Sequence, residues 1–479
     1  MPEKWTSRRR FIQMLGMGSA LMFRPLYSQV SPGKKLNFVF ILVDDLGWSD
    51  LGCYGADLHE TPNIDRLAKE SVRFTQAYAA SPVCTPTRAS IMTGKHPARL
   101  NMTVWRESTL EDPDPQRELF PPRCVSDLPH SEFTIAEALR EAGYKTAHIG
   151  KWHLGGASHY PETHGFDVNI GGTHWGAPET FFYPYRGDAY FGDYRYVPHL
   201  EFGKDGEYLT DRLTDEALKV MEEYHDEPFY LNMAYHTVHS PIEGKPELVE
   251  YYREKLRQGL NQKNAAYAAM VHSLDQNVGR ILDRIDELGI TDQTVVMLFS
   301  DNGGVANEIR GDFVTSNHPL RSGKGSLYEG GIREPLLVRW PGATAEGSTC
   351  EEPVCSTDLY PTMLEVLGID GDRDQNRHMD GISFASLLRD PGASLGRDIL
   401  FWHYPHYYPT TTPVSAVRKG DWKLLKYYEN GRVELYNLRD DLGEENNLAS
   451  QMPGKAAELQ QILHDCLTSV EAQLPTRNP

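Results

Sequence analysis

The sequence has little basic charge, few cysteines and no long apolar run. Its 479 residues include 48 Lys and Arg against 67 Asp and Glu, a formal net charge of -19. A nucleic-acid-binding protein carries a basic footprint, so this balance argues against a nucleic-acid partner. An acidic protein can still bind an anion, but only through a pocket where cations converge.

Cysteine is too scarce for a disulfide scaffold. Six cysteines are spread along the chain, at positions 53, 84, 124, 350, 355 and 466. A fold stapled by disulfides needs a denser set in a shorter chain. Cys350 and Cys355 are close enough in sequence to bridge a small loop, but we expect free thiols.

No apolar run approaches the length of about 20 residues that spans a bilayer. The uncharged stretch at residues 11–23 follows the twin-arginine pattern Ser7-Arg8-Arg9-Arg10-Phe11. A basic segment before a short apolar one is typical of an export signal. We therefore predict that residues 1–32 are an export signal and leader, that no segment spans a membrane, and that the protein is periplasmic or secreted. A disordered basic tail is the alternative.

Apolar runs alternate with helical periods along most of the chain. Residues 36–43 form a continuous apolar run, which favours a central parallel strand. Residues 265–288 repeat apolar side chains every three or four positions, which predicts a helix. Further strands are expected at 144–149, 229–235 and 294–299, and further helices at 62–71, 134–143 and 211–225. The alternation predicts an α/β fold, with a large, mostly parallel sheet covered by helices on both faces.

The pattern changes after residue 395. Residues 421–426 and 432–438 alternate as strands and flank Asn430-Gly431, which predicts a hairpin. A helix is expected at about 454–469. We predict a large domain at 33–395 and a small α+β subdomain with an antiparallel sheet at 396–479.

Acidic and amide side chains follow two of the predicted strands. Asp44 and Asp45 come directly after the first strand, and Asp301 and Asn302 follow a late one. Open α/β sheets bind ligands at the carboxyl ends of their strands. Three carboxylates and an amide oxygen suit calcium or magnesium better than zinc.

A cysteine stands at the start of a predicted helix. Residues 84–88 read Cys84-Thr85-Pro86-Thr87-Arg88, and proline is tolerated at the first helical position because its missing N–H needs no partner there. The free N–H groups and positive dipole end of the helix would point back at residue 84. Arg88 adds a planar cation suited to sulfate, phosphate or carboxylate.

Further cations and histidines lie in glycine-rich loops or at strand ends. Lys151 and His153 flank a tryptophan after a predicted strand, His236 ends another strand, and Lys324 lies in Ser322-Gly323-Lys324-Gly325. Together with Arg88 they supply converging cations in an otherwise acidic chain.

Taken in order, these motifs resemble the type I sulfatases of the alkaline-phosphatase-like superfamily. The resemblance extends along nearly the whole chain and makes residues 33–395 a sulfatase catalytic domain. It is carried by Asp44-Asp45, the Cys-x-Pro-x-Arg signature of residues 84–88, Gly150-Lys151-Trp152-His153, His236, Asp301-Asn302-Gly303-Gly304 and Gly323-Lys324-Gly325.

The resemblance implies hydrolysis of a sulfate ester of a sulfated carbohydrate. A maturation enzyme would convert Cys84 to formylglycine (3-oxoalanine), whose hydrate is the nucleophile and forms a covalent sulfo-enzyme intermediate. One Ca2+ would be held by Asp44, Asp45, Asp301, Asn302 and the modified residue 84.

The resemblance also assigns roles to the cations and histidines. Arg88 and Lys151 would stabilise the hydrate and the developing charge. His153 would take a proton from the hydrate. His236 and Lys324 would bind the sulfate and stabilise the leaving alcohol.

Residues for the sugar are less clearly marked. His239 could reach the sugar beside the sulfate. Residues 174–196 are unusually aromatic and could form a sugar-stacking wall, and the C-terminal subdomain could close the pocket. The candidates in these two regions are His174, Trp175, Arg186, Arg195, His403 and His406.

Two other functions are compatible with such a scaffold. One is a phosphomonoesterase or phosphonate hydrolase of the same superfamily, although serine or threonine with two zinc ions is usual for its phosphatases. The other is a non-catalytic protein that binds sulfated glycans.

Overall fold

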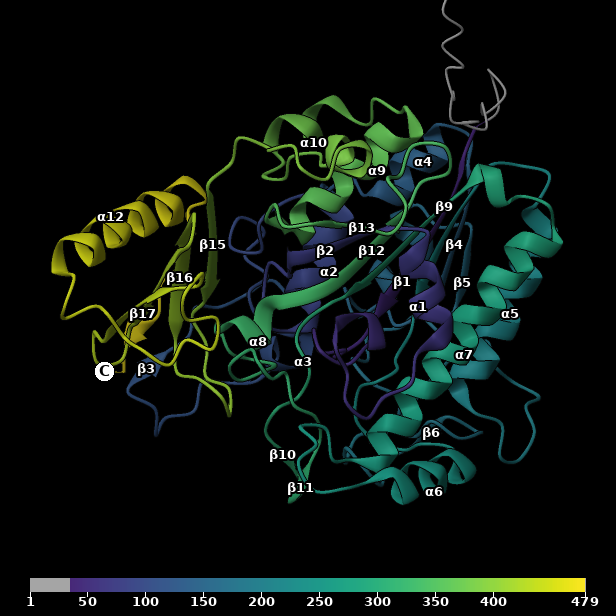
Figure 1. Ribbon diagram of the computed structural model, residues 1–479, viewed down its shortest axis with the longest axis horizontal. Helices are drawn as coiled ribbons and strands as arrows, with labels where there is room; N and C mark the ends of the chain where they lie inside the picture. The colour runs from purple at the N-terminus through teal and green to yellow at the C-terminus, as the bar shows by residue number, and fades with distance from the viewer. Residues whose placement is uncertain (1–34, 479) are drawn as a thin grey trace, which may run out of the picture.

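The computed structural model describes residues 35–478. Within that range, nine strands form one sheet in the order β13-β2-β12-β9-β1-β8-β4-β5, with β14 also paired to β2 (Figure 1). The strands are β1 (Asn37–Val43), β2 (Val72–Tyr78), β4 (Lys145–Gly150), β5 (Val168–Ile170), β8 (Phe229–Ala234), β9 (Thr294–Ser300), β12 (Arg333–Arg339), β13 (Ser348–Cys350) and β14 (Val354–Cys355).

The sheet is mostly parallel, as predicted. Strand β1 pairs in parallel with β8 and β9, and β4 pairs in parallel with β8 and β5. Only β12 runs against its neighbours β2 and β9 in the described sheet. This antiparallel strand is absent from the sequence prediction, because a buried apolar run carries no information about strand direction.

The apolar run at residues 37–43 is explained by burial on both sides of the sheet. Val39, Ile41 and Val43 belong to one apolar core. The alternate residues, Phe38, Phe40 and Leu42, belong to the other. A strand with two buried faces loses the polar alternation of a half-exposed strand.

Helices cover both faces. The first core includes residues of α1 (Pro62–Lys69), α5 (Leu209–Tyr224) and α7 (Ala265–Glu287). The second includes residues of α2 (Cys84–Thr93), α4 (Ile135–Glu141), α9 (Leu359–Leu367) and α11 (Ala385–Arg389). Shorter or peripheral elements are α3 (Arg106–Thr109), α6 (Pro246–Lys255), α8 (Glu329–Ile332), α10 (Arg373–His378), β3 (Leu119–Phe120), β6 (Arg186–Gly187), β7 (Arg195–Tyr196), β10 (Glu308–Ile309), β11 (Asp312–Phe313) and β19 (Thr476–Arg477).

A second, four-stranded antiparallel sheet lies beside the main one within the described chain, at the left of Figure 1. Helix α12 (Pro453–Ser469) packs its apolar side chains against one face of it. Its strands are β15 (Ile399–Tyr404), β16 (Val414–Lys419), β17 (Trp422–Tyr427) and β18 (Val433–Asn437). The predicted antiparallel C-terminal sheet is therefore present, while the exact domain boundaries stay predictions.

Other predictions fall partly outside the structure. The predicted export signal at residues 1–32 lies outside the described residues. Among the residues that are described, no helix is both long and apolar enough to cross a membrane. All six cysteines are described, and each is a free thiol.

A buried ion network joins the two sheets. The Nζ of Lys423, on β17, lies 2.8 Å from Glu329 Oε1 and 3.0 Å from Glu444 Oε1. All three side chains are fully buried. Glu329 begins α8, directly before β12 of the main sheet. The network therefore connects the C-terminal sheet to the main sheet.

Replacing Lys423 by Met is expected to lower the free energy of unfolding by about 3–5 kcal/mol, because Glu444 then stays buried without its cation. Chemical denaturation measures the change. The control is Lys419→Met on the neighbouring strand, whose ion pair with Glu458 is exposed, and whose loss should cost less than about 1 kcal/mol. Equal effects of the two variants would contradict the role given to this network.

Candidate active site

The two acidic pairs predicted from the sequence meet at one edge of the sheet. Strands β1 and β9 are adjacent, with Val43 opposite Ser300, so the residues after them lie side by side. The backbone N–H of Asp45 donates to Asp301 Oδ1 at 3.2 Å, and Asn302 Nδ2 donates to Asp45 Oδ1 at 2.7 Å. These groups are all buried.

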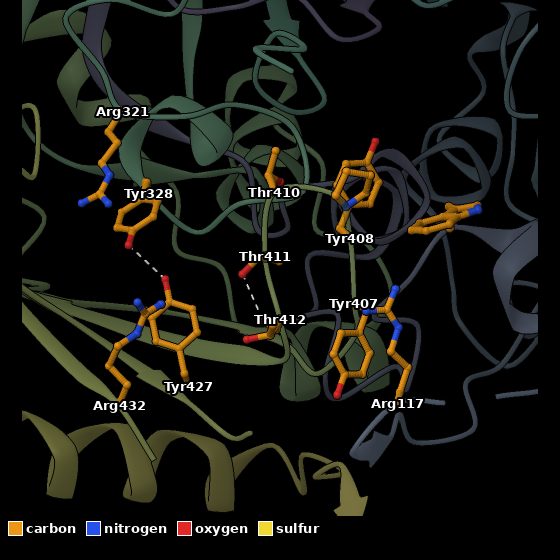
Figure 2. Close-up of a pocket in the computed structure, with 12 residues that line it drawn as sticks. Arg117, Arg321, Tyr328, Tyr407, Tyr408, Thr410, Thr411, Thr412, Tyr427 and Arg432 are labelled. Carbon is orange, nitrogen blue, oxygen red and sulfur yellow. Dashed lines mark hydrogen bonds between the residues drawn. The ribbon is translucent and has the colours of Figure 1, made fainter. Parts of the chain in front are cut away.

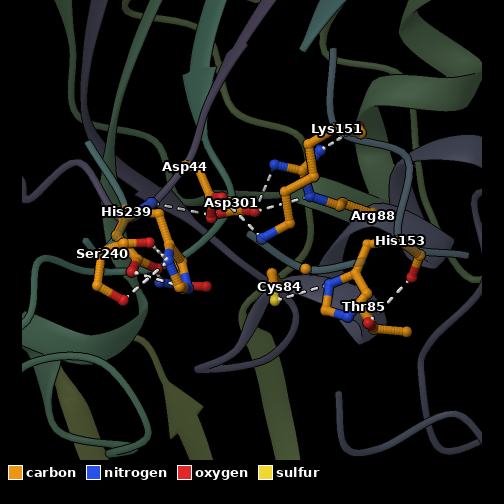
Figure 3. Close-up of polar contacts among 12 residues, drawn as sticks. Asp44, Cys84, Thr85, Arg88, Lys151, His153, His239, Ser240 and Asp301 are labelled. Carbon is orange, nitrogen blue, oxygen red and sulfur yellow. Dashed lines mark hydrogen bonds and ion pairs between the residues drawn. The ribbon is translucent and has the colours of Figure 1, made fainter. Parts of the chain in front are cut away.

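Each of the three carboxylates has its own buried cation, and Figure 3 labels two of the three pairs. Lys151 Nζ lies 2.7 Å from Asp44 Oδ2. Arg88 Nε donates to Asp301 Oδ2 at 2.8 Å. Lys324 Nζ lies 2.7 Å from Asp45 Oδ1. Burial raises the pKa of Asp45, but Lys324 and His239 outweigh it and hold that pKa well below its usual value.

Some oxygens at this edge remain without a partner. Asp44 Oδ1 and Asn302 Oδ1 are buried and accept no hydrogen bond from any described residue. Ligand atoms of Asp44, Asp45 and His239 lie within 4.8 Å of one another. Free buried carboxylate and amide oxygens are the donors that a hard divalent cation needs. The residues present therefore fit a calcium-type cation.

Cys84 stands beside this cluster, at the first residue of α2. Its Sγ lies 3.3 Å from His153 Nδ1, and the residue is 3% exposed. Burial raises the pKa of the thiol, but Lys151 and His153 outweigh it and lower that pKa to about 6. A nucleophile at this position would thus lie in a strongly electropositive pocket.

The start of α2 differs slightly from the prediction. The helix begins at Cys84, so Pro86 is its third residue and not its first. Proline fits there too, because none of the first four helical N–H groups has an intrahelical partner. The helix still directs its N-terminal dipole end at residue 84.

Glu107 is a site residue that sequence reasoning missed. Its Oε2 lies 2.6 Å from His153 Nε2, and its Oε1 accepts from Gly176 N at 3.0 Å. Burial lowers the pKa of His153, but Glu107 and Cys84 outweigh it and raise that pKa above its usual value. Glu107 therefore fixes the ring and favours its protonated form. It lies in the four-residue helix α3, where no periodicity distinguishes it from a solvated carboxylate.

His236 lies two residues beyond the end of β8. Its side chain is buried, and neither ring nitrogen has a partner among the described residues. Burial, reinforced by Lys151 and Arg88, keeps the pKa of His236 far below its usual value. A neutral imidazole with free nitrogens beside these cations can bind a ligand oxygen.

The candidates for sugar binding are placed differently from one another. His239 Nε2 lies 3.6 Å from Asp45 Oδ2, inside the cluster. His174 Nδ1 bonds to the Tyr160 hydroxyl at 3.0 Å, and its ring lies against Trp175. The Arg195 guanidinium is over the rings of both Trp175 and Phe191.

Arg186 and the two C-terminal histidines are not brought into the cluster. Arg186 is exposed on the small strand β6. His403 bonds through Nδ1 to Ser415 Oγ at 2.6 Å and through Nε2 to Gln473 O at 2.9 Å. His406 Nε2 lies 2.8 Å from Thr103 Oγ1. Both histidines are buried, so their contacts favour a structural role.

Comparison with known proteins agrees with this geometry. The family model "Sulfatase" matches residues 36–369, and "N-sulphoglucosamine sulphohydrolase, C-terminal" matches residues 322–473. The N-acetylgalactosamine-6-sulfatase of Homo sapiens is 32% identical over 413 residues, covering 80% of this chain and 74% of the human protein. The steryl-sulfatase of Rattus norvegicus is 33% identical over 448 residues, covering 79% of this chain and 74% of the rat protein.

A solved structure is similar over nearly the full length. The crystal structure of Ps i-CgsB has a TM-score of 0.75 and 28% identity, covering 90% of this chain and 92% of that one. A second structure of it is a complex with k-i-k-neocarrahexaose. With a family model over most of the chain and relatives above 30% identity, the chain belongs to the sulfatase family and is a sulfuric ester hydrolase.

Proposed function

We propose that the protein hydrolyses a sulfate ester on a sulfated carbohydrate, with residue 84 as the nucleophile. The observation that carries the proposal is the position of Cys84 at a helix start, 3.3 Å from His153 and among buried cations. A carbohydrate substrate is supported by the name of the human relative and by the saccharide bound in the Ps i-CgsB crystal.

The nucleophile would be formylglycine, made from Cys84 by a maturation enzyme. Its hydrate would supply an oxygen nucleophile that can later release sulfate by returning to the aldehyde. The lowered pKa of Cys84 reflects a site built to stabilise negative charge on residue 84.

Ca2+ would be held by Asp44, Asp45, Asp301 and Asn302 together with residue 84. When bound, it would polarise the sulfate oxygens as a Lewis acid. The two buried oxygens without partners, Asp44 Oδ1 and Asn302 Oδ1, support this assignment.

The cations of this chain would bind the sulfate and stabilise charge in the transition state. Arg88 and Lys151 are fixed by Asp301 and Asp44, so they need no rearrangement during the reaction. Arg88 Nη1 also donates to Lys151 O at 2.8 Å, which fixes the two segments relative to each other.

The histidines would move protons. His153, whose Nδ1 faces the side chain of residue 84, would in its neutral form take a proton there, and Glu107 would stabilise the resulting imidazolium. His236 and Lys324 would bind the sulfate and stabilise the leaving alcohol oxygen. The unpartnered nitrogens of His236 support that role.

The first test is the mass of the peptide spanning residues 74–88 from protein purified from its native source. If Cys84 becomes formylglycine, the peptide is about 18 Da lighter than its cysteine form and reacts with hydrazides. The peptide spanning Cys124 in the same digest is the control and should keep its thiol. An intact thiol at residue 84 in mature, active protein would contradict the proposed nucleophile.

Replacing Glu107 by Gln removes the negative charge beside His153 but preserves side-chain size. We expect kcat on a small aryl sulfate to fall about 10- to 100-fold, because the imidazolium loses its partner. Steady-state kinetics and thermal melting measure the effect. Glu111→Gln, on the exposed stretch just after α3, should leave kcat unchanged. An unchanged kcat in the Glu107 variant would contradict the positioning role.

Removal of the metal should destabilise the protein. Ca2+ would bind these side chains only in the folded protein and would thereby stabilise it, so EGTA should lower both activity and melting temperature. Added Ca2+ should restore both, and the rise in melting temperature should depend on its concentration. An Asn302→Leu variant should show no response of melting temperature to Ca2+. If neither EGTA nor Ca2+ changes the melting temperature of the wild-type protein, the proposed metal site is wrong.

A further inference from the structure

A cavity of about 720 Å³ lies between the C-terminal sheet and the catalytic domain (Figure 2). Residues of the C-terminal sheet region and of the catalytic domain both line this cavity. Arg117 and Arg321 belong to the catalytic domain, whereas Arg432 and the segment 407–412 belong to the C-terminal part. We call this cavity the arginine groove. None of the residues proposed above for catalysis or metal binding lines it.

The groove gathers three arginines, each stacked on a tyrosine. The guanidinium carbon lies 4.7, 3.9 and 4.0 Å from the ring centre in the pairs Arg117–Tyr407, Arg321–Tyr328 and Arg432–Tyr427. Stacking holds a guanidinium plane in place and leaves its in-plane N–H groups free for a planar fork of hydrogen bonds. Such forks match sulfate and carboxylate oxygens.

The charge of the groove is opposite to that of the whole protein. The chain has a net charge of -19, yet none of the described residues that line the groove is acidic. Two acidic side chains pair with arginines of the groove. Asp114 is 3.3 Å from Arg117, and Glu434 is 3.4 Å from Arg432. The side chains of Arg117 and Arg432 remain 53% and 52% exposed, so both can still meet a ligand.

Arg321 has a different role in the wall. Its Nη1 donates to Glu444 O and, at 3.2 Å, to the hydroxyl of Tyr436. It therefore links the catalytic domain to the C-terminal sheet. The two exposed arginines are the better probes of ligand binding.

The groove adjoins the active site. Thr410 Oγ1 donates to the carbonyl oxygen of Lys324 at 2.9 Å. The Tyr408 ring packs on Gly325, where an added Cβ would lie 1.9 Å from the ring. Trp105 meets Tyr408 edge to face at 5.6 Å and directly precedes α3, which carries Glu107. The groove thus shares its walls with the segments that hold Lys324 and Glu107.

We propose that the arginine groove binds an anionic sugar residue of the same glycan chain, outside the residue whose sulfate is removed. The ligand is a sulfate or carboxylate group on a neighbouring sugar, and the exposed arginines bind it. This proposal rests on the proposed function, because it extends that substrate beyond one sugar. It implies that a longer anionic chain is a better substrate than a monosaccharide or an aryl sulfate.

The test compares two double variants. Arg117→Gln with Arg432→Gln removes both exposed cations of the groove. Arg377→Gln with Arg439→Gln removes two arginines whose side chains are 70% and 75% exposed elsewhere, so it matches the loss of charge. The probes are sulfated hexasaccharides from chondroitin 6-sulfate, heparin and carrageenan, and the small substrate 4-nitrocatechol sulfate.

Binding is measured by calorimetry in a Cys84→Ala background, so that turnover plays no part. We expect the groove variant to bind the best hexasaccharide about tenfold or more weakly and the control within about twofold. A higher salt concentration should reduce the difference in affinity between the groove variant and the control variant. In the otherwise wild-type enzyme, KM for that glycan should rise with kcat unchanged, and turnover of 4-nitrocatechol sulfate should be unaffected.

The experiments distinguish an error in the groove proposal from an error in the proposed function. Equal affinities of the two double variants for the hexasaccharide would contradict glycan binding in the groove. So would the absence of hexasaccharide binding by the Cys84→Ala protein with an intact groove. If the groove variant cleaves the glycan with an unchanged KM, the groove proposal is wrong and the proposed function is still supported. Groove-dependent binding in a protein that desulfates no glycan would overturn the function and leave the groove as a binding site.

Discussion

The candidate active site depends on the pairing of three buried carboxylates with three buried cations. Asp44, Asp45 and Asp301 lie at the carboxyl ends of two adjacent strands, where backbone geometry alone brings them together. Buried charge without a partner costs several kcal/mol per ion, so the edge is stable only when cations meet it. Those cations are Arg88, Lys151 and Lys324, and each comes from a different segment of the chain.

This pairing explains why the surrounding segments have their positions. Helix α2 must place Arg88 against Asp301, and this places the buried Cys84 beside the same cluster. The loop after β4 must bring Lys151 to Asp44, and two residues later it brings His153 to Cys84. The charges that stabilise the fold are therefore the charges that would act on a sulfate. Because they are already fixed, little reorganisation is needed during reaction.

Much of the fold could be predicted because its signals are local. The two-sided burial of β1 and the apolar stripe of α7 are visible as continuous or periodic apolar residues. The direction of β12 and the role of Glu107 could not be predicted, because both depend on contacts between distant segments. Glu107 meets His153 across 46 positions. The sequence also predicts His403 near the pocket, but the side chain bonds to Ser415 within the C-terminal sheet. Side chains alternate between the two faces of a strand, and the sequence of this strand does not show which face meets the pocket.

The segment at residues 321–332 connects the candidate active site with the C-terminal sheet. In this segment Lys324 forms an ion pair with Asp45, and its carbonyl oxygen accepts a hydrogen bond from Thr410. The segment ends in α8, where Glu329 forms an ion pair with Lys423. A displacement of the C-terminal sheet would therefore be transmitted directly to a cation of the active site. The same segment also contributes Arg321 and Tyr328 to the wall of the arginine groove. In the proposed complex a glycan would bridge the two, so this segment would determine which neighbouring anion can be recognised while the sulfate is in place.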